Sequence, residues 1–188
     1  MKIIKSFGLL VGVLVFLSSC RDFVEPNVPY STFDNGVYLR TISRGPTTFS
    51  LAGLSSSRLA LTLEAVDIED GATVEKVDIR VRHRRLIPGV GLQYTPVANV
   101  LVKTLTSSDF APNSESRFLR TTFEVTASET LDAVGLEDSE IEVADVFEYQ
   151  VILTDKKGRV FSSSNVTTNV AGAPFYASPF QYFQTVAD

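Results

Sequence analysis

VFEYQVILTDKKGRVF, residues 146 to 161, is the stretch of the chain that decides the fold. Its first half has a period of two, in which Phe147, Tyr149, Val151 and Leu153 alternate with Glu148, Gln150 and Ile152. Successive side chains of a β-strand point to opposite faces, so this pattern predicts a half-buried strand. Asp155-Lys156-Lys157-Gly158 follows, and its glycine suits the positive φ of a short hairpin turn. The stretch therefore predicts two antiparallel strands.

The same period of two occurs earlier in the chain. Val77, Ile79 and Val81 alternate with Asp78, Arg80 and Arg82, and Glu69-Asp70-Gly71 offers the same turn chemistry before them. One short helix is predicted over Glu129–Val134, with Ser128 as its N-cap. Further strands are predicted at Val37–Ile42, Leu59–Val66, Val97–Leu105, Phe118–Val125 and Val160–Ser164. Seven or more strands without alternating helices favour an all-β fold, an antiparallel β-sandwich of the immunoglobulin or fibronectin type III kind.

The first 19 residues have the features of an export signal. Lys2 and Lys5 precede an apolar run, Phe7 to Leu17, which is shorter than the roughly 20 residues that span a bilayer. The run ends in Leu17-Ser18-Ser19-Cys20, which resembles the lipobox of bacterial lipoproteins. Cys20 is the only cysteine, so no disulfide competes for it. We predict a signal peptide over 1–19 and acylation of Cys20; the alternative is an ordinary secretory peptide followed by a chance cysteine.

Residues 20–35 are predicted to be a lipid-anchored tether, because they carry Pro26 and Pro29 and show little periodicity. Residues 36–188 are predicted to form one β-sandwich domain that includes a C-terminal aromatic segment. Asp22 and Glu25, soon after the cysteine, resemble the surface-export signal of Bacteroidota lipoproteins. The resemblance implies an outer-membrane lipoprotein exposed on the cell surface; the periplasmic face is the alternative.

The composition of the chain allows a sizeable core. Hydrophobic residues make up 44% of the 188 residues and include 13 Phe. Without Lys2 and Lys5 the 17 basic residues fall to 15 against 22 acidic ones, a net charge of −7. An acidic balance of this size disfavours nucleic acid as a partner.

The lipobox, residues 33–42 (FDNGVYLRTI) and residues 172–182 (GAPFYASPFQY) together resemble small Bacteroidota lipoproteins that accompany Sus-type nutrient-uptake systems. The resemblance implies a noncatalytic accessory to glycan or peptide uptake, or to another envelope complex. Its implied partner is a TonB-dependent barrel or another envelope protein, with a glycan as a possible ligand. A structural or adhesive surface protein and a surface hydrolase are the alternatives. No site residue carries over from the resemblance.

Catalytic signals are weak in this sequence. His83 is the only histidine, and no hydrolase, zinc-protease or phosphate-loop motif occurs. We therefore expect no catalytic residue, no metal site and no cofactor, and a structural or rim role for His83. The arginines Arg80, Arg82, Arg84 and Arg85 could bind an anion, but a solvated or edge-protecting role is favoured. The seven acids between Glu129 and Asp145 match no calcium loop.

The C-terminal aromatic segment is the candidate contact surface. Its residues are Phe175, Tyr176, Phe180, Tyr182 and Phe183, interrupted by Pro174 and Pro179. Such rings could stack on sugars or on a partner, but carbohydrate platforms favour Trp, which this chain lacks. Because exposing several Phe rings in water is unfavourable, packing against the sandwich or docking on a partner is the preferred interpretation.

Overall fold

The structure is a computed structural model, and it describes residues 35–188. The predicted signal peptide, the predicted acylation site Cys20 and residues 20–34 of the predicted tether lie outside the described residues. Residues Asn35–Asp188 form one compact unit.

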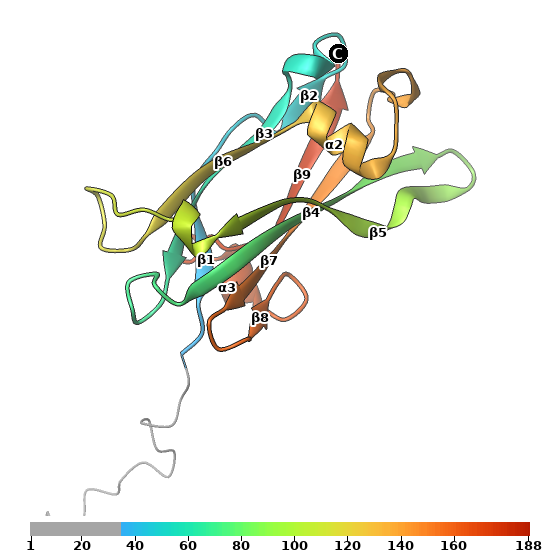
Figure 1. Cartoon of the computed structure of the whole chain (residues 1–188). Coiled ribbons are helices and arrows are strands. Elements are labelled where there is room, and N and C mark those ends of the chain that lie inside the picture. The colour runs from blue at the N-terminus through green and yellow to red at the C-terminus, as the bar shows by residue number, and fades with distance from the viewer. Residues whose placement is uncertain (1–34) are drawn as a thin grey trace, which may run out of the picture. The chain divides into compact units, whose positions relative to one another are not determined.

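The fold is an all-β sandwich, as the period of two predicts (Figure 1). The small sheet has three strands in the order β1-β3-β6, with bounds Tyr38–Arg44, Arg58–Val66 and Arg120–Thr126. The large sheet has six strands: β2, β9, β7, β4 and β5 lie in that order, and β8 pairs with β7. Their bounds are Thr48–Ser50, Gln181–Ala187, Val146–Asp155, Val74–Ile87, Gly91–Thr106 and, for β8, Val160–Phe161.

This strand order has the topology of immunoglobulin-like sandwiches. The small sheet occupies the positions of strands A, B and E, and β4, β7 and β9 occupy those of C, F and G. β2 pairs parallel with β9, while the other strand pairs are antiparallel. The core lies between the sheets and takes alternate residues of each strand, among them Leu59, Leu61, Leu63, Val77, Ile79, Val81, Phe147, Tyr149 and Val151.

The predicted helix exists, but its N-cap was assigned to the wrong residue. Helix α2 spans Ala127–Val134 and is capped by Thr126, not by Ser128. The Thr126 hydroxyl accepts from the Glu129 amide, and the Glu129 carboxylate accepts from the Thr126 amide. This reciprocal capping box fixes the helix start two residues earlier than predicted. A second short helix, α3, spans Thr168–Gly172.

The two predicted turns differ in what they connect. Asp155–Gly158 joins β7 to β8 as predicted, with Gly158 at φ 77°. Glu69–Gly71 joins β3 to β4, which belong to different sheets, so it is an inter-sheet connection and the hairpin prediction was wrong. The Asp67 carboxylate accepts from the amides of Glu69 and Gly71 and organises this loop. Gly71, at φ 98°, has no room for a side chain, because a Cβ there would lie 2.7 Å from the Ala65 carbonyl oxygen.

The sequence did not predict β2 or β9, and two of the predicted strands differ from the observed ones by more than two residues at one end. β8 ends at Phe161 instead of Ser164, because Asn165 caps the chain there by accepting from the Ser162 amide. β5 begins at Gly91 instead of Val97 and pairs along nearly all of β4. The register between them shifts at Val81 and His83, so the strand bulges around Pro96, which cannot donate a ladder hydrogen bond.

Candidate functional site

The C-terminal aromatic segment does not form one surface. Phe180 and Tyr182 are buried in the core, and the Tyr182 hydroxyl lies 2.7 Å from the Thr41 hydroxyl. Phe175 is exposed, Phe183 is partly exposed on the outer face of the large sheet, and Tyr176 packs edge-on against Tyr38. Burial decides between the two interpretations for Phe180 and Tyr182, since neither side chain is available to a ligand.

The arginines of β4 are held by the domain itself. Arg82 and Arg84 both bind the carboxylate of Glu148, at 2.7 and 2.6 Å. Arg82 also lies over the Tyr94 ring at 3.9 Å. Arg80 donates to the carbonyl of Asn99 at 3.3 Å, within the bulge of β5. Glu148 balances only one of the charges of Arg82 and Arg84, but it holds both side chains in place, which weakens the idea that the stripe is a free anion site.

Sequence reasoning missed the most exposed apolar surface of the described domain. β4 pairs with β7 only as far as Arg84, so residues 85–93 continue as a two-stranded projection, here called the hairpin arm (Figure 1, green). Leu86 is 68% exposed, Val90 82% and Leu92 52%. The signal was present in the sequence as LIPGVGL, residues 86–92, seven residues without a charge. An exposed apolar group of this kind is typical of a contact site.

The hairpin arm lies at the opposite end of the sandwich from the first described residue. The carbonyl of Asn35 accepts from Arg159 at 2.9 Å, in the turn after β7, and β7 ends opposite the start of β4, where Asp155 pairs with Val74. We call this the entry end. β4 then runs 14 residues to Ile87, which is roughly 45 Å of extended chain. The arm therefore projects at the end remote from the entry of the chain, the hairpin end.

A cleft of about 180 Å³ lies under the hairpin arm. Two cross-strand pairs form one wall, because His83 faces Thr95 and Arg85 faces Gln93. The loop after α2 supplies the other wall through Leu136 and Glu140. The cleft thus joins strand residues and loop residues that are more than forty positions apart in the sequence.

Asp145 holds this loop against β4. Its carboxylate accepts from Arg85 at 2.6 Å and from the Glu142 amide at 2.9 Å. Burial alone raises the pKa of Asp145, but the hydrogen bonds from Arg85 and the Glu142 amide, together with His83, outweigh it and leave the pKa below its usual range. Glu142 also pairs with Arg85, at 2.9 Å. Asp145 and Glu142 therefore hold the loop against Arg85.

His83 is the unusual member of the cleft. It is only 4% exposed, and its Nε2 lies 3.0 Å from an oxygen of Asp145 without the alignment of a hydrogen bond. Its Nδ1 has no hydrogen-bond partner either. In the described part of the chain no hydroxyl or thiol contacts the ring nitrogens, and no three potential ligands gather around a metal position. The contact with Asp145 gives Nε2 a structural role, but it leaves Nδ1 unexplained.

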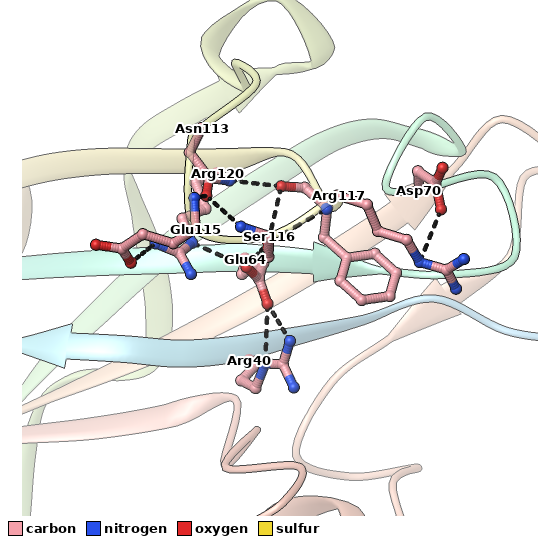
Figure 2. Close-up of polar contacts among 9 residues, drawn as sticks. Arg40, Glu64, Asp70, Asn113, Glu115, Ser116, Arg117 and Arg120 are labelled. Carbon is pink, nitrogen blue, oxygen red and sulfur yellow. Dashed lines mark hydrogen bonds and ion pairs between the residues drawn. The ribbon is translucent and has the colours of Figure 1, made fainter.

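A second buried polar cluster lies in the small sheet, nearer the entry end. Figure 2 shows Glu64 of β3 between Arg40 of β1 and Arg120 of β6, with Ser116 donating from the neighbouring loop. Burial alone raises the pKa of Glu64, but the hydrogen bonds from Ser116, Arg40 and Arg120 outweigh it, so the pKa is lowered. Because both carboxylate oxygens are occupied by the domain, this cluster has the character of a structural brace.

Comparison of the chain with models of known protein families and with curated proteins found no match. Among residues 35–188, none of the helices has the length and apolarity needed to cross a bilayer.

Proposed function

We propose that this chain is a noncatalytic, lipid-anchored envelope protein that docks a partner through its hairpin end. The observation that carries the proposal is the hairpin arm, with Leu86, Val90 and Leu92 exposed at the end of the sandwich remote from Asn35. An anchor that precedes Asn35 would hold the entry end near the membrane. The arm would then be free to reach an envelope partner.

The anchor is supported by the sequence alone. The lipobox-like Leu17–Cys20 follows an apolar run, and Cys20 is the sole cysteine. Two or three acyl chains, palmitate among them, bind a membrane far more firmly than one. We place the protein on the outer membrane, exposed at the cell surface.

A noncatalytic role is supported by the surroundings of His83. A histidine that acts as a general base needs a nucleophile within hydrogen-bond reach, and none contacts either ring nitrogen in the described domain. The resemblance to small Bacteroidota lipoproteins supports the finer role, an accessory to nutrient uptake or another envelope complex. A TonB-dependent barrel is the partner that this resemblance implies.

Site-specific photo-crosslinking in the native envelope tests the docking claim. Benzoylphenylalanine replaces Val90 at the arm or Ile68 at the entry end, two exposed apolar positions. We expect one adduct of defined mass from position 90, absent from position 68 and lost when Leu92→Ser is added. Equal adducts from both positions, or an adduct that is indifferent to Leu92→Ser, would contradict docking by the arm.

Cys20→Ser tests the anchor separately. The variant should incorporate no radiolabelled fatty acid and should leave the membrane fraction. Normal labelling of the variant would refute acylation at Cys20 without bearing on the hairpin arm.

A further inference from the structure

The cleft under the hairpin arm contains a buried polar group that the domain does not satisfy. His83 is 4% exposed; its Nε2 lies 3.0 Å from an oxygen of Asp145, and its Nδ1 has no hydrogen-bond partner. Buried polar atoms in folded proteins are nearly always paired, since an unpaired one loses its hydration without compensation. The ring lines an open cleft, so a bound group could supply the missing partner.

The neighbouring carboxylate determines which kind of partner is missing. Nε2 lies 3.0 Å from Asp145 Oδ2, so the proton of a neutral ring is favoured on Nε2. In that neutral form Nδ1 keeps a lone pair and is an acceptor, so the group that satisfies it is a hydrogen-bond donor.

The charges around the cleft determine the charge of that donor. Arg85 is the only cationic side chain of the lining, and it is bound at 2.9 Å or less by the carboxylates of Asp145 and Glu142. The Glu140 carboxylate also lines the cleft, and it accepts only from the backbone amide of Glu137, at 2.8 Å. Three carboxylates thus surround one guanidinium. A negative potential of this kind favours a cation and opposes an anion.

From these contacts we infer that the cleft binds the ammonium or guanidinium group of a basic side chain presented by the docking partner. The cation donates to Nδ1 of His83 and pairs with the Glu140 carboxylate, while Gln93 and Thr95 offer further oxygen acceptors on the strand wall. The inference rests on the proposed docking function and names the chemistry that the partner must carry. It adds a specific polar contact to the apolar contact of the arm.

The single histidine makes a direct experiment possible. In the domain 35–188, which forms a compact unit of its own, the imidazole signals of His83 are the only histidine signals in an NMR spectrum. Four probes are titrated at constant pH: a blocked Gly-Lys-Gly peptide, the same peptide with acetylated lysine, a blocked Gly-Asp-Gly peptide and methyl glucoside. The acetylated peptide keeps the length of the lysine side chain and removes its charge.

We expect the lysine peptide to shift the His83 signals in a saturable way, with a Kd of roughly millimolar for one charge-assisted contact. The other three probes should bind at least about tenfold more weakly. Glu140→Gln should weaken lysine-peptide binding about threefold to tenfold. Glu124→Gln is the matched control, because Glu124 is an exposed glutamate of the small sheet, and it should leave binding unchanged.

Three results would overturn the inference. Equal binding of the lysine and acetyl-lysine peptides would remove the role of the charge, and saturable binding of methyl glucoside alone would make the cleft a sugar site. Absence of any shift with the lysine peptide at about 20 mM would mean that the cleft binds no basic side chain. The isolated domain contains neither the anchor nor a partner, so these results are independent of the crosslinking and acylation tests.

Discussion

Glu64 and His83 are both buried polar residues on strands, yet the domain treats them in opposite ways. Glu64 lies nearer the entry end, is fully buried, and receives side-chain donors from Arg40, Arg120 and Ser116 (Figure 2). His83 lies toward the hairpin end; its Nε2 lies 3.0 Å from Asp145, and its Nδ1 has no hydrogen-bond partner. A buried polar group that is fully paired stabilises the fold, whereas an unpaired one beside a cleft is free to serve a ligand. Burial by itself does not separate the two cases.

Among the substitutions that test this comparison, the one that removes the Glu64 carboxylate should lower the stability of the domain most. Glu64→Ala leaves Arg40 and Arg120, both partly buried, without their shared carboxylate. Breaking a buried ion pair on one side typically costs about 3 to 5 kcal/mol. For a domain of this size that loss lowers the melting temperature by roughly 10 °C.

Glu124→Ala is the control for the brace. The exposed pair of Glu124 and Arg58, at 3.1 Å, contributes under about 1 kcal/mol. Melting curves of the two variants therefore separate a buried brace from a surface pair. If Glu64→Ala had the same melting temperature as the Glu124→Ala control, the Glu64 cluster would not be structural.

Phe180→Ala should lower the free energy of unfolding about as much as Glu64→Ala, through the loss of an apolar side chain instead of an ion pair. The side chain is 2% exposed, and truncating a buried Phe typically costs about 3 to 5 kcal/mol. Phe175→Ala, five residues earlier and exposed, should change stability by under about 0.5 kcal/mol. Chemical denaturation of both variants measures the difference. Similar losses in the two variants would mean that the C-terminal aromatics act as one unit.

The brace should also make stability depend on pH. The pKa of Glu64 is lowered in the folded domain, so its contribution is fully present above its unfolded pKa of about 4.3 and is lost as the pH falls through the folded value. The pKa values of Asp67, Asp145 and Asp155 are lowered as well, so they act in the same direction. In urea denaturation, Glu64→Gln should lose less stability than the natural chain between neutral pH and about pH 3. An unchanged slope would assign the acid sensitivity to the other carboxylates.

The sequence predicts the strands well because the signal for a strand is local. The alternation of Val77, Ile79 and Val81 with polar residues predicts which face of the strand is buried, and all three side chains lie in the core. The helix start was missed because Thr126 and Ser128 are both good N-caps, and only the pairing with Glu129 distinguishes them.

The site was harder to predict because its parts are distant in sequence. Asp145 is 62 positions from His83, and no local spacing brings the two together. The partners of the arginine stripe come from β7 and from the bulge of β5, so the sequence showed the charges without the contacts that hold them. The apolar run 86–92 was visible, but its exposure follows only from β4 and β5 extending past β7.

His83→Leu combines a small expected effect on stability with the most direct test of the proposed cation site. Leucine removes the contact of Nε2 with Asp145, but Asp145 keeps Arg85 and the Glu142 amide as partners. We predict a loss of under about 1 kcal/mol in the free energy of unfolding. Binding of the blocked Gly-Lys-Gly peptide, followed for this variant by the amide signals of Thr95 and Gln93, should fall below detection. A loss of about 3 kcal/mol or more together with unchanged peptide binding would contradict the account, because His83 would then be a structural residue like Glu64.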